Sequence, residues 1–257
     1  MKTVEKLFIA EKINDEYIIK GFAEREYIEK YGIRHLTTII VPYITDGNDK
    51  RKWILHDRSA KIRAKMWVKG KCPPFKTEYD KSYNLIGGHC SAEGNEGLFG
   101  EPIQENLIRE DAKRELTEEV YTEGDDIFLE IWDENGNTGK TKSAKKYNCD
   151  DLLEFVGVAE YGTVGSGNVE YSFVYALPIS SVEYNNLLFA DDYISPNDKK
   201  NHNVFLEKKL FTADELANMP IACVNGKSSA EICDAITRLW LPQNKAVLKK
   251  LLKITNK

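Results

Sequence analysis

The sequence lacks several features that would place it in a common class of protein. It has only five cysteines among 257 residues, an odd number, and no two of them form a CxxC pair. A disulfide framework and a cysteine-based zinc site both need paired or closely spaced cysteines, so neither is predicted. Scattered cysteines are typical of a reducing compartment, and we expect a cytoplasmic protein.

Long apolar runs are also missing. No stretch approaches the roughly 18 consecutive apolar residues that a membrane-spanning helix requires. The N-terminal segment MKTVEKLFIAEKINDE has charges inside its one short apolar run, which is unlike a signal peptide. We therefore expect no membrane association.

An excess of positive charge is absent as well. The chain has 36 Lys and Arg against 41 Asp and Glu, a net charge of -5. This balance gives no general attraction to nucleic acid or to an anionic membrane, so no stable nucleic-acid binding is expected. A phosphate-bearing ligand would have to be held by local features, such as a metal ion or a few placed basic side chains.

The order of the predicted elements indicates a mixed α+β domain. Strand-like runs precede one long helix, more strands follow it, and the chain ends in helices. The long helix is predicted from about Pro102 to Tyr121, with its C-terminal cap at Gly124. The other predictions are a hairpin of 4–10 and 16–23 around Asn14-Asp15, strands at 36–44, 52–56, 83–86, 127–132, 153–161 and 169–177, helices after the capping boxes Thr212–Glu215 and Ser228–Glu231, and a last helix at 243–254.

The most informative segment is RELTEE, residues 114–119. On a helix, Glu115 lies three residues before Glu118 and four before Glu119, so the three side chains share one side. Neighbouring carboxylates repel one another unless a cation compensates, and Mg²⁺ prefers carboxylate oxygens. A solvated acidic face is the alternative interpretation of these residues when they are taken alone.

This segment resembles the Nudix box, a family motif with the pattern G-x5-E-x7-R-E-U-x-E-E-x-G-U, where U is aliphatic. RELTEE matches the most diagnostic half of the motif, and Gly87-Gly88-His89 supplies the Gly-Gly turn that the family places before the helix. The chain departs from the pattern at two positions, with Asn106 in place of the first glutamate and Tyr121 in place of the last glycine. The spacing from the turn to the helix is also longer, which predicts an inserted loop within 89–105.

The resemblance covers roughly residues 4–220 and is nearest to the isopentenyl-diphosphate-isomerase-like branch of the superfamily. The matching segments include GFAEREYIEKYGIRH, ILHDRSAK, VEYSFVYALPI and FLEKKLFTADEL. The resemblance implies one domain in which a mixed β-sheet is sandwiched between helices. Its expected parts are an N-terminal β extension with a hairpin (1–33), a Nudix core (34–220) and a C-terminal helical extension (221–257).

The resemblance also implies a metal site. Glu115 and Glu119 would be the main ligands of a Mg²⁺ or Mn²⁺ ion, with Glu118 as a third ligand. The backbone carbonyl near Gly88 would complete the shell. Arg114 would form a salt bridge that orients one of the glutamates.

The catalytic set is predicted more broadly as Glu115, Glu118, Glu170 and Glu160, with Glu170 and then Glu160 as candidates for the general base. Glu170 begins a late strand, at a place where the isomerase branch has a metal-binding glutamate. Glu160 lies beside a glycine-rich loop. For both Glu170 and Glu160, a simple surface charge is the alternative.

Three residues are candidates for contacts with the substrate. Arg58 and Arg63 could bind a phosphate group, although solvated charge explains them equally well. His89 follows the Gly-Gly turn and would face the site. His35 and His89 both match histidines that bind metal in the isomerase branch, but for His35 we favour an ordinary hydrogen-bonded histidine.

The predicted function is Mg²⁺-dependent hydrolysis of a nucleoside diphosphate linked to another moiety, such as a nucleotide sugar, through attack of a metal-activated water on phosphorus. The predicted partner is a small diphosphate substrate, and a homodimer is possible because the family often dimerises. One alternative is an isomerase, which needs a cysteine directly before the Gly-His pair; this chain has Gly87 there, and Cys90 follows the pair. The other is a Nudix-like module that senses a nucleotide without cleaving it.

Overall fold

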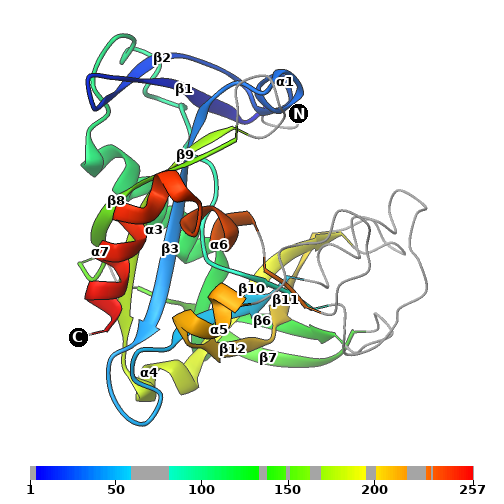
Figure 1. Cartoon of the computed structure of the whole chain (residues 1–257). Helices are drawn as coiled ribbons and strands as arrows, with labels where there is room; N and C mark the ends of the chain where they lie inside the picture. The colour runs from blue at the N-terminus through cyan, green and yellow to red at the C-terminus, as the bar shows by residue number, and fades with distance from the viewer. Residues whose placement is uncertain are drawn as a thin grey trace.

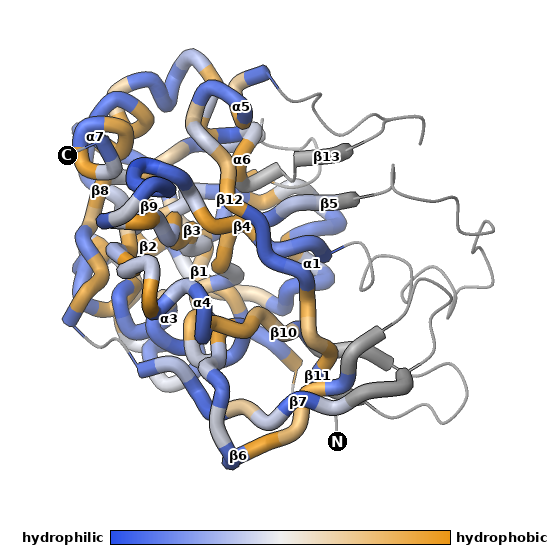
Figure 2. The backbone as a smooth tube through the Cα atoms, turned by 90° about the horizontal axis from the view of Figure 1, so that it is seen from below, coloured by the Kyte–Doolittle hydropathy of each residue, from blue (hydrophilic) through white to orange (hydrophobic). Residues whose placement is uncertain are grey.

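The computed structural model describes residues 4–58, 81–132, 138–148, 151–162, 169–194, 201–218, 230–232 and 234–256. Two β-sheets and several helices form a mixed α+β structure, as the order of the elements predicted (Figure 1). Within these residues, none of the helices is long and apolar enough to cross a membrane. Figure 2 shows short hydrophobic stretches alternating with hydrophilic ones along the chain.

The strands and helices have the following bounds. The strands are β1 Lys6–Ile13, β2 Glu16–Glu24, β3 His35–Ile44, β4 Trp53–Asp57, β5 Lys81–Asn84, β6 Val120–Trp132, β7 Thr138–Lys146, β8 Glu154–Tyr161, β9 Glu170–Ile179, β10 Leu187–Ile194, β11 Asn201–Leu206, β12 Lys208–Phe211 and β13 Ala230–Ile232. The helices are α1 Arg25–Tyr31, α3 Glu105–Glu119, α4 Ser181–Asn186, α5 Ala213–Asn218, α6 Asp234–Leu239 and α7 Lys245–Thr255, with a 3-10 turn, η1, at Pro242–Asn244.

The larger sheet is centred on β3 and β9. These two strands pair in parallel over their whole length, so β9 occupies one edge of β3. Along the other edge, β4, which leads to β5, and β1, which leads to β2, pair with β3 near its two ends. Side chains of β3 alternate between two apolar layers, with Leu36 and Ile40 packed under α3 and Ile39 and Val41 packed against α6 and α7. Helices thus cover both faces of the central strands, which explains why both strands are almost entirely buried (Figure 1).

The smaller sheet has the strand order β10-β11-β6-β7, with β10 also pairing with β6. Its strand β6 begins at Val120, directly after the last residue of α3. Tyr121 pairs with Lys146 of β7 and with Leu188 of β10. The sheet therefore starts at the end of the helix that carries Glu115, Glu118 and Glu119, here termed the box glutamates.

The sequence prediction for this central helix was wrong at both ends. The helix begins at Glu105, whereas Pro102 forms an isolated β-bridge with Ile18. It ends at Glu119 because Val120 is already extended, with φ -120° and ψ 132°, and Gly124 lies inside β6 rather than at a cap. β-branched and aromatic residues after Glu119 gain more from pairing with β7 and β10 than from another helical turn.

Two local predictions are confirmed and a third is not. Asn14 and Asp15 have positive φ values of 48° and 65° and form the turn between β1 and β2. Thr212 and Glu215 form the predicted capping box, since the Glu215 N–H donates to Thr212 Oγ1 at 3.2 Å and the Thr212 N–H donates to the Glu215 carboxylate at 2.6 Å. The second predicted box fails because Glu231 lies in β13; its partner Ser228 is outside the described residues.

Candidate functional site

The segment around Gly87-Gly88 is extended along β3 rather than a turn as predicted, and hydrogen bonds to β3 fix it in place. The Ile40 N–H donates to the Ile86 carbonyl at 2.8 Å, and the Thr38 N–H donates to the Gly88 carbonyl at 2.8 Å. The Gly88 carbonyl, the predicted metal ligand, is therefore turned toward β3. This pairing also sets His89 beside the first residues of β3.

Both glycines are required by close approaches. Gly87 has φ +147°, and a Cβ there would lie 2.2 Å from the Thr38 carbonyl oxygen. At Gly88, a Cβ would lie 2.4 Å from Glu115 Oε2. Glycine at position 88 thus allows the Glu115 carboxylate to rest against the backbone of this segment.

Helix α3 presents the three box glutamates at its C-terminal end. Glu115 and Glu119 are buried, whereas the side chain of Glu118 is 54% exposed. The predicted salt bridge of Arg114 is present, since its Nη2 lies 2.7 Å from Glu115 Oε1 and its Nη1 lies 3.1 Å from Glu118 Oε1. Its Nη2 also donates to the His89 carbonyl at 2.9 Å, which ties the helix to the extended Gly-Gly segment.

The burial of Glu115 changes its titration. Burial raises the pKa of Glu115 to about 7; the nearby Arg114 opposes this rise and Glu118 adds to it. A carboxyl group with a pKa near neutrality gains from a cation placed against it, because the cation favours its charged form.

The three glutamates line one cavity of about 630 Å³, here termed the carboxylate cavity. Arg58 is held in this cavity by Asp191, with Nε to Oδ2 at 3.0 Å, and its Nη2 lies 3.9 Å from Glu119 Oε1. Acidic and basic side chains therefore face a common space, a composition that suits a divalent cation and an anionic ligand together. The other lining residues are Glu5, Arg25, Gly87, Gly88, His89, Arg114, Tyr121, Lys146 and Asn203.

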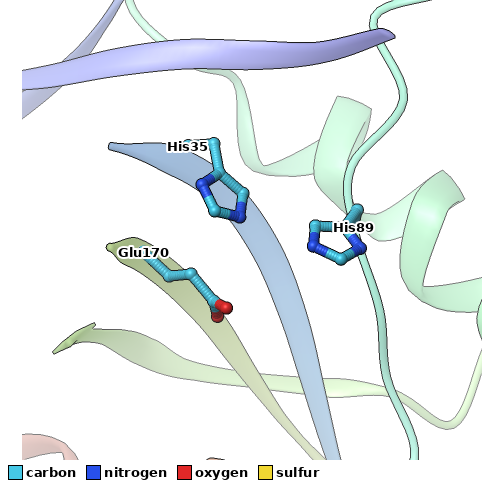
Figure 3. Close-up of side chains that lie close together, drawn as sticks. All are labelled: His35, His89 and Glu170. Carbon is cyan, nitrogen blue, oxygen red and sulfur yellow. The ribbon is translucent and has the colours of Figure 1, made fainter. Parts of the chain in front are cut away.

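A second set of side chains could ligate a metal ion, and it includes His89, directly after Gly87-Gly88. One ligand atom each from His35, His89 and Glu170 lies within 4.8 Å of the other two, and Figure 3 shows the three side chains converging from β3, β9 and the extended Gly-Gly segment. His35 Nδ1 lies 3.1 Å from the Ile33 carbonyl, which assigns the ring proton to Nδ1. Among the described residues, the buried His35 Nε2 has no hydrogen-bond partner, so this nitrogen is available to a cation.

The protonation states of His89 and Glu170 suit a cation. Burial lowers the pKa of His89 to about 4, helped by the charge of Arg25 and by His35, so the ring is neutral near pH 7. Burial acts to raise the pKa of Glu170, but the ion pair and hydrogen bond with Arg238, together with His35 and Thr37, outweigh it and lower the pKa to about 2. Metal binding needs neutral imidazoles and an ionised carboxylate.

A carboxylate with so low a pKa is a weak base. Glu170 is therefore better suited to bind a metal ion than to act as the general base, the role that was predicted for it. Arg238 of α6 reaches Glu170 from the C-terminal helices and also donates to Ser172 Oγ at 2.7 Å. A cavity of about 120 Å³ opens beside Glu170 and Arg238. This histidine cavity shares residues 87–89 with the carboxylate cavity.

The remaining predicted residues are placed as follows. Glu160 lines neither cavity; its carboxylate lies 3.3 Å from Lys12 Nζ and its N–H donates to Asn244, so it lies apart from the other candidates. Arg63 lies outside the described residues. Within the described residues, the box glutamates do not form a compact three-ligand group of the kind made by the histidine cluster, because Arg114 draws Glu115 and Glu118 to itself.

Sequence reasoning undervalued His35. A lone histidine at the start of a buried strand usually has a structural role, and its Nδ1 does have one. The signal that could have found its second role is the parallel register that places His35 opposite Glu170, but this pairing becomes known only with the fold.

No model of a known protein family matches the chain, and no curated protein is significantly similar to it.

Proposed function

We propose that the protein is a divalent-metal-dependent hydrolase that cleaves a diphosphate linkage in a small substrate, with the Nudix-type fold and box that its sequence resembles. The observation that carries the proposal is that all three box glutamates line one cavity together with basic side chains. Carboxylates alone would hold a cation, and basic groups alone would hold an anion. Their combination suits a metal-bound phosphate group.

Glu115 and Glu119 are the residues that would hold the cation. Both are buried, and both offer carboxylate oxygens, the ligand type that Mg²⁺ prefers. A bound divalent cation would lower the pKa of a coordinated water and neutralise phosphate charge. Glu118 is exposed to the cavity, and its ion pair with Arg114 uses only Oε1, so we assign to Glu118 the acceptance of a proton from the attacking water.

The histidine cluster would hold a second cation. Two imidazole nitrogens and one carboxylate favour Mn²⁺ or Zn²⁺ over Mg²⁺, which prefers an all-oxygen shell. The orphaned Nε2 of His35 is the structural feature that supports this assignment. Because residues 87–89 border both cavities, a cation in the histidine cluster would add positive charge close to a phosphate group in the carboxylate cavity.

Within the described part of the chain, the isomerase alternative has no thiol to use. A side chain at position 87 would collide with the Thr38 carbonyl, so a cysteine cannot be accommodated there without moving β3. Cys90 is fully buried, and burial raises the pKa of its thiol well above the usual value. Such a thiol is inert toward proton transfer to a ligand in either cavity.

The test is phosphate release from nucleoside triphosphates, nucleotide sugars and dinucleotides, with Mg²⁺, Mn²⁺ or a chelator. We expect metal-dependent turnover that falls by about 100-fold or more in Glu119→Gln, because loss of metal binding removes several kcal/mol of transition-state stabilisation. Glu110→Gln is the matched control, since Glu110 lies on the same helix and its side chain is 71% exposed. Metal-dependent binding of a panel member without any turnover would overturn the hydrolase and favour the sensing module.

A further inference from the structure

The smaller sheet forms one wall of the carboxylate cavity. Its strand β6 starts directly after Glu119, and Tyr121 stands opposite Lys146 in the β6–β7 register. Residues paired in this way project from the same face of a sheet. Tyr121 and Lys146 both line the cavity, so the position of Lys146 beside the box helix follows from the strand pairing.

Lys146 differs from the other basic residues of the cavity. Arg25, Arg58 and Arg114 each make a close ion pair with a carboxylate, whereas no carboxylate in the described part of the chain pairs with Lys146. Its charge is therefore available to a ligand. The three arginine pairs are Arg25–Glu29 at 2.7 Å, Arg58–Asp191 at 3.0 Å and Arg114–Glu115 at 2.7 Å.

The volume of about 630 Å³ allows one small molecule to contact the box glutamates and Lys146 at once. A terminal phosphate carries close to two negative charges near pH 7, whereas a phosphate esterified on both sides carries one. An ammonium group acts as a compact point charge with three donors, so it favours the more highly charged group.

We propose that Lys146 binds an unsubstituted terminal phosphate of the substrate. The smaller sheet thereby selects phosphate chains with a free end over diphosphates capped at both ends. This inference rests on the proposed function for its substrate chemistry, and it names the substrate class: a nucleoside triphosphate or a similar phosphate chain rather than a nucleotide sugar.

Binding can be measured without turnover. The probe is methylenediphosphonate, which has two free ends and a bridge that cannot be hydrolysed, titrated calorimetrically in Mg²⁺. Lys146→Met keeps an unbranched side chain as long as the aliphatic part of lysine and removes the charge, so the Kd should rise roughly 10-fold or more. Lys145→Met is the matched control, because Lys145 projects from the opposite face of β7 with its stem across Gly124, and its Kd should stay within about 2-fold of wild type.

Turnover gives a second readout. In Lys146→Met, kcat/KM for a nucleoside triphosphate should fall roughly 10-fold through KM, while kcat/KM for a nucleotide sugar stays unchanged. An unchanged Kd for methylenediphosphonate, or an equal loss for both substrates, would overturn the recognition of a free end. If wild type turns over neither substrate but Lys146→Met still weakens probe binding, the hydrolase proposal fails and the role of Lys146 stands.

Discussion

Gly88 is the position at which one added methyl group should disturb the carboxylate cavity most directly. A Cβ on residue 88 would lie 2.4 Å from Glu115 Oε2 and 2.5 Å from its Cδ, well inside van der Waals contact. The obstacle is a side chain rather than backbone, so Glu115 can move. In Gly88→Ala we expect the carboxylate to swing away and lose its 2.7 Å contact with Arg114.

The magnitude follows from overpacking. Adding a methyl group to a well-packed interior costs about 1–3 kcal/mol, and each kcal/mol lowers the Tm of a chain of this size by about 2–4 °C. If the collision with Glu115 is the cause, removing that side chain should remove the cost. Gly88→Ala on a Glu115→Ala background should therefore cost less than about 0.5 kcal/mol, which gives a coupling energy of about 1–3 kcal/mol.

The assay is urea denaturation of wild type, the two single variants and the double variant at one pH. Gly97→Ala is the control, because a Cβ at Gly97 meets nothing within 4 Å, and its effect should stay within about 0.5 kcal/mol. If the two single costs add within about 0.5 kcal/mol in the double variant, the steric reasoning is refuted.

Three further variants test the electrostatics of the two sites. The pKa of Glu115 is about 7 in the folded chain against an ordinary 4.5. Protonation of Glu115 therefore contributes its full stabilisation of the fold below pH 4.5, and this stabilisation is lost as the pH rises through 7. Glu115→Gln should therefore gain about 2–3 kcal/mol relative to wild type between pH 5 and 8 in urea titrations, and a flat difference would contradict this. The pKa of His89 is lowered from 6.5 to about 4. The neutral ring therefore contributes its full stabilisation of the fold above pH 6.5, and this stabilisation is lost as the pH falls through 4. His89→Asn should become more stable relative to wild type on acidification across that window, and a parallel profile would count against it. Arg238→Met leaves Glu170 buried without its cation and should cost about 3–5 kcal/mol. Mn²⁺ or Zn²⁺ should raise the Tm of this variant more than that of wild type, whereas equal shifts would argue against a cation in the histidine cluster.

The parts of the fold that the sequence predicted correctly are those fixed by local chemistry. Asn14 and Asp15 tolerate positive φ, and Thr212 with Glu215 satisfies the free N–H groups of a helix start, so neighbouring residues alone are sufficient. The spacing of Glu115, Glu118 and Glu119 belongs to the same group, because the helical period places all three at the same cavity.

The errors concern partners that are distant in sequence. The helix ends at Glu119 because β7 and β10 offer pairing to the residues that follow, and these strands lie far along the chain. No strand was predicted at 187–194, where two aspartates interrupt the apolar run; Asp191 is tolerated because it pairs with Arg58 at 3.0 Å. Neither this strand pairing nor this ion pair can be predicted from a short stretch of neighbouring residues.

The histidine cluster shows the same limit at the level of chemistry. Its three residues come from separate parts of the chain, and the parallel register of β3 with β9 brings His35 opposite Glu170. The extended segment after β5 then adds His89, whose carbonyl accepts a hydrogen bond from Arg114 at 2.9 Å. The backbone that carries a ligand of one cavity therefore also anchors the arginine that orients the glutamates of the other. A displacement of this segment would alter both cavities together, and a side chain at Gly87, which would meet the Thr38 carbonyl of β3, is the change that would force one.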